Sequence, residues 1–173
     1  MLGCVVNQTN PDGYIWHLLV LNQDFIHAAF NTSEQAAILT THLENPDNPF
    51  NSIDGGDDTD DKIFLLGLSD VYGEDSHYKD DKWYFNNNSD RKAMATKYAV
   101  VNRKVSAYNH DEQKWCNETN FQTNKCSSYW WLRSPGIYAN YAALVIGDGF
   151  VNYDGISVDG TVVGVRPALY VQY

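Results

Sequence analysis

Apolar residues recur at helical spacing between residues 24 and 44, which predicts two short helical pieces. The residues that carry this spacing are Phe25, Ile26, Ala29 and Phe30. Thr32 and Gln35 are spaced as a capping box, so we expect the second piece to begin there and to run through Leu43. The dipeptide Asn45-Pro46 then ends it, because a residue before proline avoids helical backbone angles.

The middle of the chain alternates between polar loops and short ordered segments. Residues 45–61 are rich in Asp, Asn, Gly and Pro, which predicts a loop, and residues 62–66 then predict a short buried strand. Residues 89–101 have apolar positions at helical spacing behind Ser89, which suits an N-cap, so we expect a second helical region there. Residues 102–128 are polar and predict a loop interrupted by Trp115.

Strand signals dominate the C-terminal third. Residues 130–133 predict one strand, and residues 142–153 alternate around Gly147-Asp148-Gly149, which predicts a hairpin. Residues 163–171 predict a final strand that tolerates Pro167 only at an edge or a bulge. Because helices come early and strands come late, we expect an α+β fold with antiparallel strands.

The predicted hairpin has two faces of different composition. Val145 and Val151 fall on the face that we expect to point inward. The opposite face is unusually apolar and carries Leu144, Ile146, Phe150 and Asn152. Two interpretations stay open: this second face is an exposed patch of the kind that marks an interaction surface, or packed layers bury both faces.

Composition narrows the classes of partner. The length of 173 residues fits one domain spanning residues 1–173. The chain has 22 acidic and 12 basic residues, a formal charge of -10 and no run of Lys and Arg, so we expect neither nucleic acid nor anionic membrane as a partner. No apolar stretch approaches the roughly 18 residues that span a bilayer, so we expect no membrane insertion. The 12 Tyr and 5 Trp fit either a binding surface or an irregular core filled by large rings.

Candidate catalytic and metal-binding groups are sparse. The odd number of cysteines gives no disulfide framework, and a bridge between Cys116 and Cys126 is left open. The acidic run at residues 54–61 departs from the spacing of a calcium-binding loop, so we interpret it as a solvated loop. No hydrolase, P-loop or dinucleotide motif is present, and no histidine has an evident partner by spacing. We therefore expect no catalytic residue, no bound metal and no cofactor.

Two blocks near the C-terminus, residues 130–136 (WWLRSPG) and 164–169 (GVRPAL), resemble a bacterial and phage domain family of unassigned function. Residues 25–38 and 61–66 extend the resemblance upstream. That family is similar to the C-type-lectin-like fold of formylglycine-generating, sulfatase-modifying proteins and of the variable proteins of diversity-generating retroelements. The resemblance implies a C-type-lectin-like fold and a ligand-binding C-terminal region. Family members carry more strand sequence than residues 14–21 supply, which implies a trimmed or minimal N-terminus.

Residue usage favours the retroelement resemblance. Such elements substitute adenines, mainly in Asn codons, and this cannot produce Lys, Glu, Gln, Met or Trp. None of these five residue types occurs in residues 137–163, where usage in the whole chain predicts roughly four. A glycine-rich hairpin would also be poor in them. We therefore expect residues 137–163 to be the variable, ligand-binding region.

The predicted site consists of tolerant positions on a rigid framework that binds a protein or cell-surface ligand. The framework residues are Trp131, Leu132, Pro135, Val145, Val151, Val158, Val165 and Leu169. The predicted ligand-binding residues are Ile137, Tyr138, Asn140, Tyr141, Leu144, Ile146, Phe150, Tyr153, Ile156, Ser157 and Asp159. Aromatic rings in this set would anchor the ligand, and its polar side chains would supply hydrogen bonds.

Two alternative functions stay open. One is an invariant carbohydrate-binding or structural module of a bacterial surface protein. The other is a sulfatase-modifying enzyme, which the resemblance disfavours because those oxidases use paired cysteines in the C-terminal half and no cysteine follows Cys126. Arg133 and Arg166 lie inside apolar strand blocks, so we interpret them as structural hydrogen-bonding or ion-pairing groups.

Overall fold

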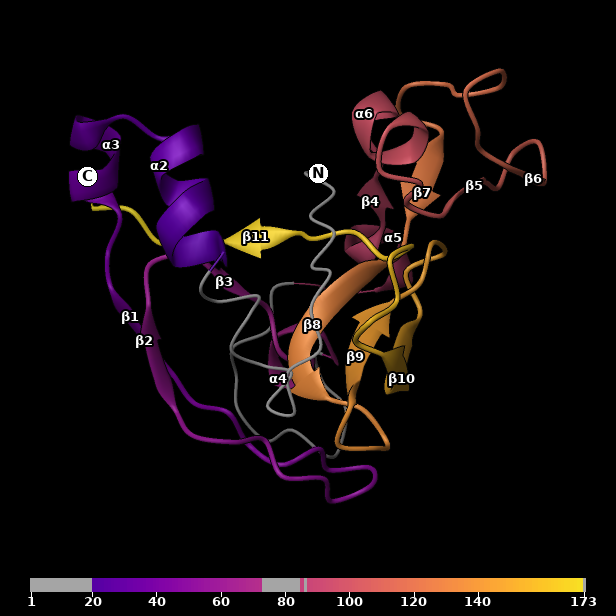
Figure 1. The fold of residues 1–173 in the computed structure, drawn as a ribbon. Coiled ribbons are helices and arrows are strands. Elements are labelled where there is room, and N and C mark those ends of the chain that lie inside the picture. The colour runs from indigo at the N-terminus through magenta and orange to yellow at the C-terminus, as the bar shows by residue number, and fades with distance from the viewer. Residues whose placement is uncertain (1–19, 73–84, 86, 173) are drawn as a thin grey trace.

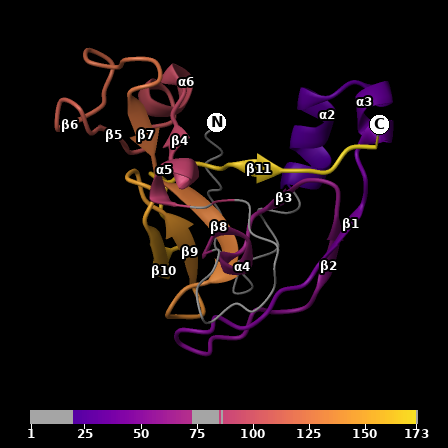
Figure 2. The same cartoon turned by 180° about the vertical axis from the view of Figure 1, so that it is seen from behind.

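The computed structural model describes residues 20–72, 85 and 87–172, and their fold is α+β with short helices and antiparallel strands (Figures 1 and 2). The helical segments are the π-helical turn η1 (Val20–Phe25), α2 (Ile26–Ala29), α3 (Thr32–Ala37), α4 (Leu68–Tyr72), α5 (Asn88–Arg91) and α6 (Lys97–Val101). The strands are β1 (Thr41–Leu43), β2 (Thr59–Asp61), β3 (Phe64–Leu65), β4 (Ala93–Met94), β5 (Ala107–Asn109), β6 (Lys114–Trp115), β7 (Cys126–Ser128), β8 (Trp130–Pro135), β9 (Tyr141–Val145), β10 (Val151–Ser157) and β11 (Pro167–Ala168). Within this described part, no helix has both the length and the apolar character needed to cross a bilayer.

The central sheet is three-stranded, in the order β10-β9-β8 (Figure 1). The hairpin predicted around Gly147-Asp148-Gly149 is confirmed: Val151 pairs with Val145, and Trp131 pairs with Leu144 on the other side. Gly149 has a φ of +89°, and a Cβ there would lie 1.7 Å from the carbonyl oxygen of Asn88. Only glycine therefore allows the turn to pack so closely against α5.

Strands β8 and β9 are buried on both faces, so the interpretation with packed layers on both sides holds for them, whereas β10 is mostly half-buried beyond Val151. One face contributes Trp130, Leu132, Ala143, Val145 and Val151 to a first core cluster. The other face contributes Trp131, Ala142 and Leu144 to a second cluster, which also contains residues from η1, α2, β3 and the segment before β11. Period-two alternation therefore decides which core a side chain enters, and not whether it reaches solvent.

The last segment, residues 163–171, is less regular than the predicted strand. Gly164 bridges to Trp130, with Trp131 N donating to Gly164 O (3.0 Å) and Gly164 N donating to Tyr129 O (2.8 Å). Only β11 pairs as a strand, and there Pro167 lies opposite Leu65 of β3. Because β11 belongs to a two-stranded sheet, the missing amide hydrogen of proline interrupts no further ladder.

The first helical region is shorter than predicted. Asn31 caps α3 by accepting hydrogen bonds from the amides of Ser33 and Glu34, while the Glu34 carboxylate accepts from the amide of Asn31. The predicted capping box at Thr32 and Gln35 was therefore wrong by one residue. α3 ends at Ala37, and β1 pairs with β2 where helix and loop were predicted. The backbone groups of β1 find partners 16 or more positions away in the sequence, which local spacing does not reveal.

The region before the central sheet also has more strand than predicted. Residues 89–101 divide into α5, β4 and α6, with Asn87 and Thr96 as N-caps in place of Ser89. Residues 102–128 contain β5, β6 and β7, which join β4 in a four-stranded sheet of order β4-β7-β5-β6. Cys116 and Cys126 form a disulfide inside the small core beneath this sheet.

We predict that Leu144→Ala lowers the free energy of unfolding by about 2–5 kcal/mol, because Leu144 is only 1% exposed and its removal leaves a cavity. Phe150→Ala is the matched control on the same hairpin. Since Phe150 is 52% exposed, it should cost about 1 kcal/mol or less. Urea titration measures both values, and equal costs for the two variants would show that Leu144 is not a core residue.

Candidate functional site

The predicted ligand-binding residues divide between the two ends of the hairpin. The turn between β8 and β9 carries Ile137, Tyr138 and Asn140, which are all exposed. This turn is held against the end of β10, since Ile137 N donates to Asp154 O (2.7 Å) and Val158 N donates to Asn140 O (3.0 Å). The turn residues therefore lie beside residues 154–158, although a whole hairpin separates them in sequence.

Two tyrosines form the centre of this end of the sheet. Tyr138 is 58% exposed, and its ring meets the half-buried ring of Tyr141 edge to face, with centroids 5.0 Å apart. Tyr141 pairs across the strands with Ser157. Asp159 is exposed just beyond β10. We define the loop surface as these neighbouring side chains: Ile137, Tyr138, Asn140, Tyr141, Ser157 and Asp159.

A bulge in β10 shapes the neighbourhood of the loop surface. The pairing of β10 with β9 shifts between Asn152 and Ile156. Gly155 lies in this bulge with a φ of +71°, and its amide donates to Asn152 Oδ1 (3.1 Å). A bulge bends its strand and redirects side chains, so the end of β10 turns toward the β8–β9 turn without continuing the flat ladder.

Four of the predicted residues belong to the interior, at least in part. Leu144 is fully buried in the second core cluster, so its prediction as an exposed contact was wrong. Ile146 and Ile156 are half-buried and pack against that same cluster. Tyr153 packs against the first cluster and stacks on Phe50 with ring centroids 4.1 Å apart. These side chains face inward because the sheet is covered on both sides.

Phe150 is exposed but lies at the wrong end of the hairpin for the loop surface. It follows the β9–β10 turn, where its amide donates to Asp148 Oδ1 (2.9 Å). The loop surface lies at the opposite ends of β9 and β10. The structure therefore does not bring Phe150 together with Tyr138 and Tyr141, and the predicted single patch was wrong in this respect.

Asn48 connects the strands that carry the loop surface, and the sequence analysis did not identify it. Its side chain is 0% exposed, and its Nδ2 donates to Pro135 O (2.7 Å) and to Tyr153 O (2.9 Å). These carbonyl groups belong to the last residue of β8 and to the third residue of β10. One side chain in a polar loop thus fixes the spacing of the two strands that present the loop surface. The only feature of the sequence that distinguishes Asn48 is its position before Pro49, and this feature is too common to identify the residue.

The two arginines of the motif blocks have structural contacts, as predicted. Arg133 forms an ion pair with Asp70 (2.5 Å) and donates to Leu65 O (3.2 Å). Arg166 lies over the rings of Phe85 and Trp130, at 4.9 and 5.0 Å, and donates to Arg91 O (3.2 Å). Burial lowers the pKa of Arg166, and its contacts to rings and a carbonyl compensate in part for lost water.

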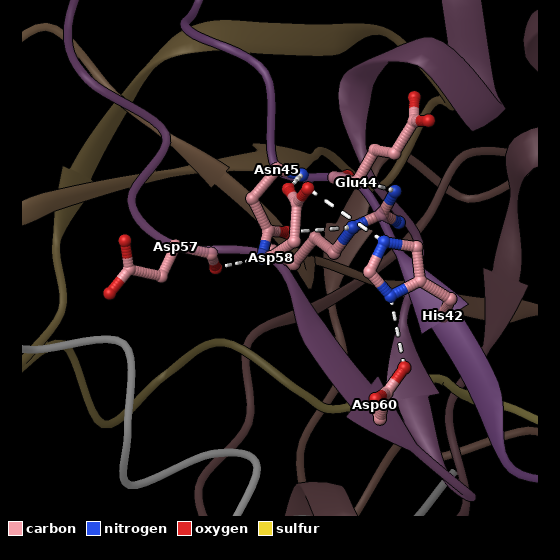
Figure 3. A network of polar contacts seen from close by, with 7 residues as sticks. His42, Glu44, Asn45, Asp57, Asp58 and Asp60 are labelled. Atoms are coloured by element: carbon pink, nitrogen blue, oxygen red, sulfur yellow. Dashed lines mark hydrogen bonds and ion pairs between the residues drawn. The ribbon is translucent and has the colours of Figure 1, made fainter.

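Polar groups of the acidic segment between β1 and β2 bond to other groups of the same chain. The amide of Asn45 donates to Asp58 Oδ1 (2.8 Å), and the side chain of Asn45 donates to the backbone carbonyl of Asp57 (2.8 Å). Figure 3 shows His42 between the carboxylates of Asp58 and Asp60. Among residues 20–72, 85 and 87–172, no group of three or more His, Cys, Asp or Glu side chains is placed to hold a metal ion.

The loop surface offers aromatic rings and hydrogen-bonding side chains. Tyrosine rings supply large faces at low cost in side-chain entropy, and Asn140, Ser157 and Asp159 supply hydrogen-bonding groups. Residues 134–165 contain no Lys, Arg or His, so every ionisable group in them other than a tyrosine is an aspartate. The surface is therefore suited to bind a partner that offers apolar groups together with donors or positive charge.

Comparison with known proteins gives one match. A family model described as a domain of unknown function (DUF6273) matches residues 19–173, which include the loop surface and both motif blocks. No match was found among curated proteins or among solved structures.

We predict that Asp60→Asn lowers the pKa of His42. In the folded chain that pKa is raised above 6.5, first by the hydrogen bond with Asp60 at 2.9 Å and then by the charges of Asp60, Asp58 and Glu44. Asp58→Asn should lower it less, because Asp58 lies 3.8 Å from Nε2. Asp57→Asn, which removes none of these causes, is the control. NMR titration of the imidazole protons measures each value.

The sign of the linked stability follows from that direction. A raised pKa in the folded chain means that protonated His42 stabilises the fold below about pH 6.5. This contribution is lost as the pH rises through the folded pKa. A wild-type titration at or below the ordinary value would contradict the assigned contact.

Proposed function

The chain belongs to the family described as a domain of unknown function, DUF6273, and we propose that it is a non-enzymatic ligand-binding protein. In this proposal it has a C-type-lectin-like fold and is the variable protein of a diversity-generating retroelement of phage or bacterial origin. Its loop surface contacts a protein or a cell-surface ligand.

The observation that supports this proposal most is the contrast between the loop surface and the sheet beneath it. Tyr138 is 58% exposed at the tip of the β8–β9 turn, whereas Trp131, Leu132 and Val145 are at most 2% exposed in the strands. Side chains on the turn can change without opening a cavity, because Ile137, Tyr138 and Asn140 are exposed. A rigid support with exchangeable contacts is the property that a diversified binding protein needs.

The arrangement of the two motif blocks supports the proposed fold. Residues 130–136 form β8 and its exit, and Gly164 of the second block bridges to Trp130, while Pro167 and Ala168 pair with β3. The ring of Trp130 lies under the guanidinium of Arg166, and its Nε1 donates to Arg91 O (3.1 Å). The blocks thus act as one frame around the central sheet, and this explains why they occur together.

Burial restricts which positions in residues 137–163 can be diversified. Ala142, Ala143, Leu144, Val145 and Val151 are core residues, so most substitutions there would destabilise the fold. The exposed positions in the turn and beyond β10 carry no such constraint. We therefore assign diversification to the loop surface, and Leu144, Ile146, Phe150, Tyr153 and Ile156 are not part of the revised site.

The state of the cysteines argues against the sulfatase-modifying alternative. Cys116 and Cys126 are bonded to each other, and Cys126 is fully buried. Both precede β8, in a sheet separate from the one that presents the loop surface. A thiol-dependent oxidation at the loop surface would need a cysteine that residues 134–165 do not contain.

We predict that replacements at the loop surface leave the fold intact. Tyr138→Asn, Asn140→Ser and Asp159→Asn should each change the free energy of unfolding by about 0.5 kcal/mol or less, because these side chains are exposed. Trp131→Ala in the adjacent strand is the matched control and should cost about 3–5 kcal/mol. Urea titration measures the four variants. A loss above about 2 kcal/mol for any loop-surface variant would count against tolerant positions.

Sequencing of the flanking DNA tests the retroelement part of the proposal. We expect a reverse transcriptase gene and a near-copy of the DNA that encodes residues 137–163. The two copies should differ where the near-copy has adenine, and the differing codons should encode loop-surface positions. A unique region without a near-copy would leave an invariant binding module as the better account.

A further inference from the structure

A second exposed surface, with no residue in common with the loop surface, lies on the four-stranded sheet. Met94 pairs with Ser127, Ser127 pairs with Tyr108, and Tyr108 pairs with Trp115, so these four side chains lie in one row across β4, β7, β5 and β6. His110 and Tyr129 lie just beyond the ends of β5 and β7, and their rings contact those of Tyr108 and Trp115. Tyr129 is half-buried and also packs against the second core cluster. The opposite face carries Ala107 and Cys126 into the small core.

We define the aromatic face as Tyr108, His110, Trp115 and Tyr129. Trp115 is 56% exposed, whereas Trp130 and Trp131 are at most 2% exposed. Figures 1 and 2 both place β6, which bears Trp115, at the outer edge of the molecule. Trp115 belongs to none of the core clusters of the described residues.

The rings of the aromatic face are held at steep angles to one another. The rings of Tyr108 and Trp115 are 5.3 Å apart at an interplanar angle of 75°, and those of Trp115 and Tyr129 are 6.3 Å apart at 56°. Tyr108 also meets His110 edge to face at 4.9 Å. Neighbouring rings therefore meet at steep angles, so the aromatic face is uneven and is not a flat apolar patch.

The position of Trp115 is fixed by its surroundings. Asn120 Nδ2 donates to Trp115 O (3.0 Å), and the disulfide between Cys116 and Cys126 fastens the next residue to β7. The hydroxyl of Ser127 bonds to Gly147 O (2.5 Å) and so ties β7 to the β9–β10 turn. A ring that is exposed and also positioned in advance loses little side-chain entropy when it binds a ligand.

Several polar side chains near the aromatic face bond to one another, and alternation along β6 places Lys114 on the face opposite to Trp115. Lys125 forms an ion pair with Asp111, and Gln122 Nε2 donates to Glu112 Oε1 (2.5 Å). What remains for a ligand is the faces of the rings, the two tyrosine hydroxyls and the imidazole of His110. This combination favours a neutral ligand with both apolar C–H groups and hydroxyl groups.

We propose that the aromatic face binds a neutral carbohydrate chain. Sugar rings present C–H groups on their faces, which the negative face of an aromatic ring attracts, and hydroxyl groups at their edges. Successive sugar units are turned relative to one another, as the rings of Tyr108, Trp115 and Tyr129 are.

The test uses the 173-residue chain with a panel of soluble probes: cellohexaose, maltohexaose, xylohexaose and the hexamer of N-acetylglucosamine. Titration followed by tryptophan fluorescence and by calorimetry should show saturable binding of at least one probe. Trp115→Ala should weaken that binding roughly tenfold or more, and Trp115→Phe, which keeps a ring, should restore most of it. The thermal midpoint should be unchanged in both variants, because Trp115 is exposed.

Tyr98→Ala is the matched control, because Tyr98 is 50% exposed on α6 and lies outside the aromatic face. It should bind the probe as the wild-type chain does. Binding that survives Trp115→Ala, or no binding to any of the four probes, overturns the proposal. Self-association that depends on Trp115 and occurs without sugar binding would overturn it in favour of a protein contact. None of these outcomes bears on the loop surface.

Discussion

Burial of strands β8 and β9 on both faces is the constraint on which the rest of the structure depends. Trp130 and Trp131 are neighbours in β8, yet they enter different core clusters. A sheet that supplies two cores has no face left for a ligand. Binding must therefore use the turns and strand ends, where Tyr138 and Asp159 reach solvent, or a separate sheet. The same burial makes the support rigid, because any shift of a strand would disturb packing on both sides.

Long-range polar contacts fasten the irregular segments to this sheet. Asn48 binds carbonyl groups of β8 and β10, and Asn22 accepts from the amides of Lys62 and Ile63 while donating to Ile63 O. A buried carbonyl or amide without a partner costs free energy, so these asparagines allow loops to lie against a core. The loops of this protein are consequently parts of its framework, although their composition is that of solvated connections.

The sequence patterns predicted the elements whose formation depends on residues that are close in sequence. The glycine-rich turn identified the hairpin, and the apolar block at residues 62–66 identified β3. The capping box was displaced by one residue because Asn31 and Thr32 are both able to cap a helix. Strands β1, β2, β4 and β7 were missed because their partners lie 16 or more positions away in the sequence. For the site, alternation correctly separated Leu144 from Val145, but one sequence does not reveal that a second layer, with Ile63 and Val165, covers Leu144.

The topology also explains how this fold can keep two independent surfaces. The loop surface lies at the β8–β9 turn, whereas the aromatic face belongs to a sheet with its own small core and its own disulfide. The two sheets are linked through the hydroxyl of Ser127 at the β9–β10 turn, which is the end of the hairpin remote from Tyr138. They are also linked through Tyr129, which contacts Trp115 and packs against the second core cluster. None of the loop-surface residues belongs to that cluster. A protein of this design could vary one contact surface while the chemistry of the other stays constant.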